Sequence, residues 1–422
     1  MYEIVSIEEV ESTQENVGAS SFLQSVFWAG FKEKSGWKKK LFLVSCKRNA
    51  SDNCTTFYLS VLSRHIKFFG LLAYVPMLED IMNRDEVEDV SGERGTFLQE
   101  LCARLFDLLP RNVFLIRVDP AWQVEVENAG GSGCHADKVE RPHINFGREK
   151  SEKDESRQAD NIKANDCVRQ SNGEHKSDDV SLSVCNRRCK SLYLKKAKTD
   201  IQPPDTVILP LEKNEDEIMA QFKSKWRYNI RLAEKKGCVV ECMPMSTGTE
   251  IDAGLDVFYS LYETTAQRDG IAIHTKSYYK TLFLLADKFP DLSVRLYIAK
   301  YEGLFLAAII TIFYKYEATY LYGASSNEYR NLMPTYLLQY RAIMDAKAFG
   351  CKTYDFYGMP PREDEGHPMA GLYRFKTGFG GKIVHRIGSI DAYCNKWRYG
   401  VYSLAEEARA FYFKRIKKWL KR

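Results

Sequence analysis

The feature that most constrains the fold is an order of strands and helices that occurs twice along the chain. In the first half, three strand-like runs precede an amphipathic helix over 96–110 and a strand over 112–120 that ends near Asp119. In the second half, strand-like runs between 292 and 326 precede a helix over 335–350 and a strand over 352–360. Alternating apolar residues favour strands, and a 3.6-residue period favours helices. The sequence therefore predicts a duplicated α/β unit.

The segment between the two halves differs in composition from both of them. From about 124 to 190 it consists mainly of Lys, Glu, Asp, Ser, Asn and Gly, with almost no aromatic residues. Such a segment cannot bury enough apolar surface to offset the entropy lost on ordering. We therefore predict a first domain over 1–123, completed by the C-terminal segment 391–422. A disordered insertion over 124–190 and a second domain over 191–390 complete the chain.

Charge and hydropathy narrow the class of protein. The net charge is +5, which favours anionic partners without identifying one. The longest apolar run, 304–313, is about half of the ~20 residues that a membrane-spanning helix needs. The N-terminus has no signal-peptide pattern, so we expect a cytoplasmic monomer. Cysteines and histidines in 124–190 are irregularly spaced, which argues against a metal site, and we expect no cofactor.

The stretch GLYRFKTGFGG, over 371–381, is the most unusual local pattern. Cations alternate with aromatic residues here, and four glycines give the backbone unusual freedom. A core strand would not carry Arg374 and Lys376, and a plain surface turn would not need Phe375. The pattern predicts a loop that binds a polar group and lets another backbone come near.

Several stretches together are similar to the Fem-type aminoacyltransferases (FemA, FemB, FemX and relatives) that form peptidoglycan bridges. They include QSVFWAGFKEKSGW, LIRVDP, KSKWRYNIRLAEKKG, YETTAQRDGIAIHTKSYY, YLYGASSNEYRNLMPTYLLQYRAI and GLYRFKTGFGG. The resemblance implies two tandem GNAT-like domains in an α/β fold. No coiled-coil arm fits after the basic helix that ends at Gly237, so the chain is most similar to the armless FemX type.

The resemblance also implies a reaction and its substrates. An amino acid would pass from aminoacyl-tRNA to the stem peptide of a UDP-linked or lipid-linked muropeptide precursor. The precursor suggests a peripheral contact with the inner face of the membrane. The basic, amphipathic segment 409–422 could make that contact or touch tRNA phosphates, or it could be a packed terminal helix. The sequence does not identify the transferred amino acid.

Two residues of the 371–381 stretch are expected to be catalytic by resemblance. The Phe-Lys pair of Fem-like enzymes corresponds to Phe375 and Lys376, and its lysine faces the acceptor end of the tRNA. We expect Lys376 to stabilise charge in the tetrahedral intermediate, and Phe375 to stack on the terminal adenine. The alternative is a solvated glycine-rich turn whose cations have no role.

Cations elsewhere are candidates for binding the precursor's diphosphate. Lys32 lies between two tryptophans on the first helix, and Arg227 lies near the start of a basic helix, where N–H groups favour anions. Lys225 and Arg231 lie on the same helix, and either of them could bind the diphosphate in place of Arg227. Tyr278 is a further hydrogen-bond donor. Each of these residues could instead be an ordinary surface side chain.

Asp119 is a candidate general base. It ends a strand where the first domain meets the interdomain region, and a carboxylate there could accept a proton from the attacking amine. It could equally cap a turn. A related function on the same fold is acyl-CoA N-acyl transfer, but the glycine-rich pyrophosphate loop that it needs is missing from 321–338. A non-catalytic RNA-binding protein is the alternative from another class.

Overall fold

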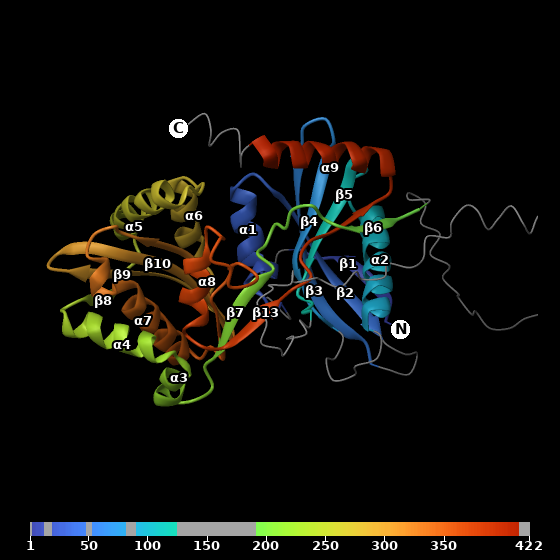
Figure 1. The fold of residues 1–422 in the computed structure, drawn as a ribbon. Helices are drawn as coiled ribbons and strands as arrows, with labels where there is room; N and C mark the ends of the chain where they lie inside the picture. The colour runs from blue at the N-terminus through green and yellow to red at the C-terminus, as the bar shows by residue number, and fades with distance from the viewer. Residues whose placement is uncertain (1, 12–18, 48–52, 82–89, 125–190, 413–422) are drawn as a thin grey trace, which may run out of the picture.

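The computed structural model describes residues 2–11, 19–47, 53–81, 90–124 and 191–412. In these residues the chain forms two mixed sheets of seven strands each, which lie side by side with helices on their faces (Figure 1). The predicted insertion, 124–190, lies almost entirely outside the described residues, as does most of the basic segment 409–422. No helix of the described residues is long and apolar enough to cross a membrane.

The first sheet has the strand order β1-β2-β3-β4-β5-β14-β6. Its strands are β1 (Glu3–Glu9), β2 (Lys38–Lys47), β3 (Thr55–Ile66), β4 (Gly70–Leu78), β5 (Val113–Pro120), β14 (Ile390–Tyr393) and β6 (Tyr193–Lys196). The first four are antiparallel neighbours, and β5 is parallel to β4. α2 (Val90–Leu108) packs its apolar residues on one face of this sheet, whereas α1 (Val26–Lys34) and α9 (Lys396–Phe411) contribute to the core on the other.

The second sheet repeats this order as β8-β9-β10-β11-β12-β7-β13. Its strands are β8 (Val239–Cys242), β9 (Leu292–Tyr301), β10 (Leu304–Tyr314), β11 (Glu317–Ser325), β12 (Thr353–Asp355), β7 (Asp205–Pro210) and β13 (Lys382–His385). Its helical elements are α3 (Glu215–Gln221), α4 (Ser224–Lys235), α5 (Gly248–Asp269), α6 (Lys276–Ala286), α7 (Pro334–Phe349) and α8 (Ala370–Thr377). Two short 3₁₀ helices, η1 (Phe22–Gln24) and η3 (Arg330–Leu332), precede α1 and α7.

The last two strands of each sheet come from distant parts of the chain. β6 and β14 are antiparallel neighbours in the first sheet, and β7 and β13 are antiparallel neighbours in the second. The chain therefore crosses between the sheets after β6 and crosses back after β13. The sequence boundary placed 193–196 in the second domain, and the pairing of β6 with β14 corrects this. The partner lies almost 200 residues away, which a local sequence pattern cannot reveal.

Apolar spacing over 254–270 predicts a helix, and the observed helix α5 begins earlier, at Gly248, because Thr247 and Glu250 form a capping box. It ends at Gly270, which has the left-handed conformation that helix ends favour. After α4, the chain turns at Gly237 and enters β8 directly. The described residues thus contain no coiled-coil arm at this position, as the sequence predicted.

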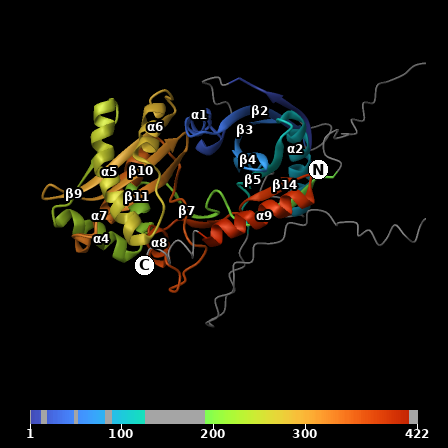
Figure 2. The same ribbon diagram turned by 90° about the horizontal axis from the view of Figure 1, so that it is seen from above.

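An apolar core joins the two domains. α1 packs against α6, and one buried cluster includes Phe27 and Phe31 of α1 with Tyr279 and Leu282 of α6. Figure 2 shows α1 between the two sheets, next to α6. Because interfaces of this kind exclude water, the domains are held in one relative orientation.

Strands β11 and β12 separate soon after they meet. Their parallel pairing runs only from Glu317 to Thr319 on β11, although β11 continues to Ser325. β12 ends at Asp355, and the chain then leaves the sheet. The opening between these two strands positions the candidate site.

Candidate active site

Lys32 and Tyr278, two predicted binding residues, meet at the junction of the domains. Lys32 Nζ donates a hydrogen bond of 3.1 Å to the Tyr278 hydroxyl, across α1 and α6. The same ammonium lies 4.6 Å from the ring centroid of Trp28 and 5.4 Å from that of Tyr278. Among the described residues, no carboxylate forms an ion pair with it. The structure thus presents a cation held by aromatic rings and not neutralised by an acid.

Burial, together with the nearby Arg64, lowers the pKa of Lys32 to about 8. His274 stacks on Tyr278 at 4.0 Å between ring centroids, and burial together with Lys32 lowers its pKa as well. The charged form of Lys32 is therefore poorly solvated. A bound anion would relieve this cost, which is the property expected of an anion-binding site.

Lys376 is buried in the opening between β11 and β12. Its Nζ donates to three consecutive carbonyl oxygens, those of Phe356 at 2.6 Å, Tyr357 at 3.2 Å and Gly358 at 2.7 Å. The Nζ lies 5.1 Å from the ring centroid of Tyr320. Burial lowers the pKa of Lys376 to about 7, and Asp355 opposes that shift. The three donors of this ammonium all have partners within the chain.

These contacts fix the backbone of Tyr357. This residue has a positive φ of 57°, which a tyrosine adopts only under constraint. Its N–H donates to Asp355 Oδ1 at 2.6 Å, and Thr206 Oγ1 donates to its carbonyl at 3.1 Å. Its hydroxyl donates to Gln202 Oε1. Lys376 thereby helps to hold Tyr357 in one orientation between the domains.

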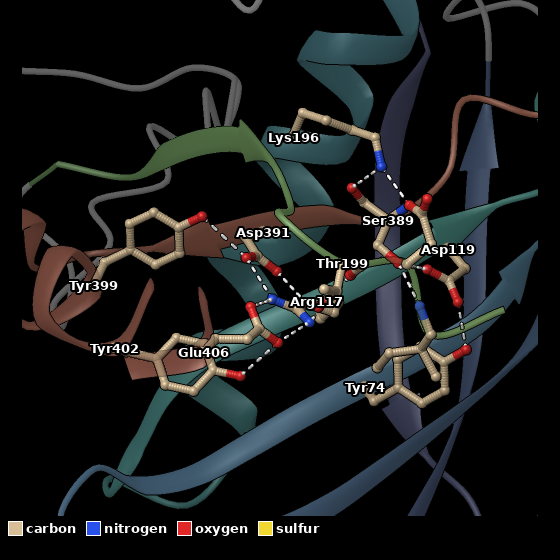
Figure 3. Close-up of polar contacts among 12 residues, drawn as sticks. Tyr74, Arg117, Asp119, Lys196, Thr199, Ser389, Asp391, Tyr399, Tyr402 and Glu406 are labelled. Carbon is tan, nitrogen blue, oxygen red and sulfur yellow. Dashed lines mark hydrogen bonds and ion pairs between the residues drawn. The ribbon is translucent and has the colours of Figure 1, made fainter. Parts of the chain in front are cut away.

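Asp119 belongs to the first domain, where it lies beside Tyr74 and Ser389 (Figure 3). Its carboxylate accepts hydrogen bonds from the Tyr74 hydroxyl at 2.5 Å, from Ser389 Oγ, and from the backbone N–H of Gln202 at 3.1 Å. Burial raises its pKa, although these hydrogen bonds act in the opposite direction. Gln202 therefore connects Asp119 to Tyr357. A catalytic role for Asp119 stays a prediction, and its anchoring of the segment between β6 and β7 is observed.

A row of polar side chains crosses the domain boundary. Burial raises the pKa of the Tyr322 phenol well above its usual value, and the neighbouring Tyr278 and Tyr357 phenols raise it further, so Tyr322 lies near both of them. We call this row the interdomain polar chain. Its members are Lys32, Tyr278, Tyr322, Tyr357, Gln202 and Asp119.

The 371–381 stretch is a helix and a tight turn, where a loop was predicted. α8 ends at Thr377, and a Cβ on Gly378 would lie 2.0 Å from the Trp226 ring. A Cβ on Gly380 would lie 2.6 Å from the Gln221 carbonyl oxygen, and one on Gly381 would lie 2.5 Å from that of Ile208. The glycines thus admit the protein's own chain, which corrects the expectation of a free loop.

Phe375 is partly buried and is anchored by its neighbours. Its ring packs edge-on against Tyr336, and its carbonyl accepts a 2.9 Å hydrogen bond from Trp226 Nε1. A stacking role on a tRNA base stays a prediction. Trp226 belongs to α4, so the basic helix lies directly against α8.

The three predicted cations of α4 are not close to Lys32. Arg227 donates to the carbonyls of Ala220 and Phe222 at the end of α3, which explains its position structurally. Lys225 and Arg231 are exposed on the same helix. α4 packs on α7, whereas Lys32 lies on α1 against α6 (Figure 1). The structure therefore separates two groups of cations that the sequence could not tell apart.

Sequence reasoning missed Tyr322, Tyr357 and Gln202. Tyr322 and Tyr357 lie in strand-like runs, and Gln202 lies in the stretch IQPPDTVILPL, which is similar to the Fem-type family but gave no reason to single out its glutamine. Only the crossing of the chain between sheets brings them together. Among the described residues, no group of three His, Cys, Asp or Glu side chains is arranged to hold a metal ion.

Two GNAT-like domains in tandem define the fold. A crystal structure of FemX superimposes on 94% of this chain and 100% of its own length, with a TM-score of 0.63 and 19% sequence identity. This likeness confirms the fold class predicted from the sequence.

The model of the FemAB family matches residues 191–303 and 294–407, just over half of the chain. The chain therefore belongs to the FemAB family, which confirms the resemblance. The Lipid II:glycine glycyltransferase of Staphylococcus aureus is 26% identical over 277 residues, which cover 50% of this chain and 63% of that protein. The chain thus spans less than two thirds of the length of the curated relatives it matches.

Proposed function

We propose that this protein transfers an amino acid from aminoacyl-tRNA to the stem peptide of a lipid-linked peptidoglycan precursor. Membership of the FemAB family supports aminoacyl transfer. The name of the Staphylococcus aureus relative, Lipid II:glycine glycyltransferase, supports a lipid-linked acceptor over a UDP-linked one. The transfer reaction would take place in the cytoplasm, at the inner face of the membrane.

The observation that carries the proposal is the Lys32–Tyr278 pair. A partly buried ammonium with a hydroxyl beside it and no acidic partner in the described residues suits the diphosphate of such a precursor. Charge-assisted hydrogen bonds to phosphate are among the strongest polar contacts in proteins. The precursor would then extend along the interdomain polar chain, with its amine toward Tyr357.

The tRNA would approach the site from the side of the second domain where α4 and α8 lie. The exposed Lys225 and Arg231 of α4 are suited to phosphates, and α4 contacts Phe375 of α8 through Trp226. Aminolysis of an activated ester requires mainly positioning and stabilisation of the oxyanion. Lys376 either supplies that charge directly, after exchanging one carbonyl partner, or acts through Tyr357.

A reconstitution experiment tests the proposal. Purified protein is incubated with a mixture of charged tRNAs and either a lipid-linked or a UDP-linked precursor, and the products are weighed by mass spectrometry. We expect one added amino-acid mass on the lipid-linked acceptor, and its loss in Lys32→Met. Lys34→Met, on the same helix, is the matched control and should stay active. Acyl transfer from acyl-CoA without tRNA would refute the proposal.

A further inference from the structure

α9 carries an apolar stripe on its outward face. Its inward face holds Tyr399 and Tyr402, which are buried against the first sheet. On the opposite side of the helix, Trp397 is 79% exposed, Val401 40% and Leu404 67%. Spacings of four and three residues place these three side chains on one face. One apolar face is enough to pack a helix on a core. We therefore interpret the second, exposed apolar face of α9 as a binding surface for another partner.

The stripe continues onto a neighbouring turn. Phe68, in the turn between β3 and β4, is 88% exposed, with Lys67 Nζ 5.1 Å from its ring centroid. Arg398 of α9 donates to the carbonyl of Phe69, which holds the turn against the helix. Figures 1 and 2 place α9 and this turn at the same end of the first domain. We call Phe68, Trp397, Val401 and Leu404 the α9 face.

Charges around the α9 face favour an anionic partner. Lys67 adjoins Phe68, and Lys396 lies beside Trp397 in the sequence. The ten residues that follow α9 and Tyr412, 413–422, contain six Lys or Arg and no Asp or Glu. Large exposed apolar side chains next to clustered cations are typical of surfaces that enter the headgroup region of anionic bilayers. Exposed aliphatic side chains such as Leu404 have no use in binding nucleic-acid phosphates.

We propose that the α9 face is a membrane-docking surface that inserts into the headgroup region of an anionic phospholipid bilayer. Trp397 and Phe68 would lie at the level where aromatic side chains concentrate in membrane interfaces. Cations around the face would contact lipid phosphates. This inference deepens the proposed function, because docking would hold the enzyme beside a lipid-linked acceptor. It concerns a surface separate from the interdomain polar chain.

Vesicle sedimentation of the full chain tests the docking surface. One set of vesicles is phosphatidylcholine alone, and the other is an equimolar mixture of phosphatidylcholine and phosphatidylglycerol. We expect binding to the anionic vesicles, and a drop in affinity of about tenfold or more in Leu404→Glu, because a charge replaces buried apolar surface. Leu304→Glu, an equally drastic change on an exposed leucine of β10, is the matched control and should bind like the wild type.

Further measurements separate this inference from its rivals. Circular dichroism should show that Leu404→Glu is folded, and Phe68→Ser provides a second variant on a different element. The proposal would be overturned if the wild-type protein did not bind anionic vesicles, or if Leu404→Glu and Leu304→Glu bound them equally well. Two results for Leu404→Glu would also overturn the proposal. One is the dissociation of a wild-type dimer, measured by size-exclusion chromatography. The other is a loss of tRNA binding while vesicle binding stays intact. Transfer to the lipid-linked acceptor dispersed in detergent, where no bilayer is present, reports separately on the catalytic proposal.

Discussion

Lys376 shows how one side chain can serve both the fold and the reaction. We predict that Lys376→Met lowers turnover by about 100-fold or more, the scale observed on removing one oxyanion-stabilising donor. The substitution also leaves three carbonyls without their donor, so unfolding free energy should fall by about 1–3 kcal/mol. Kinetics and urea unfolding measure the two effects, and the exposed Lys382→Met is the control.

Tyr357→Phe separates the two possible roles of Lys376. If the lysine acts by orienting Tyr357, removing this hydroxyl should lower turnover while precursor affinity and stability stay close to wild type. If the ammonium itself stabilises the intermediate, Tyr357→Phe should remain active. Near-normal turnover of Lys376→Met would contradict both roles and leave the residue purely structural.

The pKa of Lys32 predicts a pH dependence for acceptor binding. Burial lowers this pKa to about 8 in the free protein, so the ammonium is charged below pH 8 and neutral above it. A diphosphate prefers the charged form, and binding above pH 8 requires uptake of a proton. Affinity should therefore be constant below about pH 8 and fall about tenfold per pH unit above it. Calorimetry with a soluble diphosphate-containing precursor measures this, and Lys32→Met should lose the inflection.

The fold brings together only some of the residues that the sequence predicted for the site. Lys32 and Tyr278 meet because α1 and α6 bury their apolar faces against each other. Arg227 was grouped with Lys32 because it is a cation near the start of a helix, and neither property specifies its distance from Lys32. Tyr357 gave no signal, because its left-handed backbone depends on contacts with Lys376 and Asp355 from elsewhere in the sequence.

Individual elements depend on buried polar contacts as well as on apolar packing. Arg117 of β5 is buried and donates to both oxygens of Asp391 on β14, at 2.6 and 2.8 Å, and to Glu406 on α9 (Figure 3). Tyr399 adds a 3.0 Å hydrogen bond to Asp391. This network fastens β14 and α9, two late elements of the chain, to the first sheet.

We predict that Arg117→Met destabilises the protein by about 3–5 kcal/mol, because it leaves Asp391 buried without its cation. Urea unfolding measures the change. Arg341→Met on α7 removes an exposed ion pair with Asp345 and should cost no more than about 1 kcal/mol. Equal effects of the two substitutions would show that the buried network does not anchor α9.

At the level of elements, sequence patterns located most helices and strands. They did not show which strands pair or which elements pack against each other. Short apolar runs were enough to place β9, β10 and β11, which are hairpin neighbours. The glycines of 378–381 suggested a loop, yet packing of Trp226 and Gln221 against them explains why no larger residue fits. Composition cannot distinguish glycines that admit a ligand from glycines that admit the protein itself.

The whole molecule is held together by chain crossings as well as by its apolar interdomain core. The segment from β6 to β7 carries Gln202 from the first sheet to the second, and the segment from β13 to β14 carries Ser389 back. Both residues bind Asp119. Relative movement of the domains would therefore disturb Asp119 and the interdomain polar chain together, which ties the geometry of the site to the tertiary structure.

The described ends of the insertion allow a whole-molecule prediction. β5 and β6 flank β14, and both are antiparallel to it, so they run in the same direction about 10 Å apart. Val118 and Lys196 both lie opposite Ile390, so the chain must return along the strand direction before β6 begins. Parallel strands require a crossover of about a dozen residues. A linker of that length can therefore replace 126–188.

We predict that this deletion, with a Gly/Ser linker of about twelve residues, leaves melting temperature and turnover largely unchanged. The physical reason is that the removed segment is polar and nearly free of aromatic residues, so it has little apolar surface with which to stabilise the rest. Thermal unfolding and the transfer assay measure the outcome. Because residues 121–125 and 189–192 are retained, a linker of about three residues also leaves about a dozen residues between β5 and β6, so this shorter variant should be as stable as the longer one. If both variants lose stability, the insertion is part of the fold; if they lose only turnover, the insertion contributes to substrate binding.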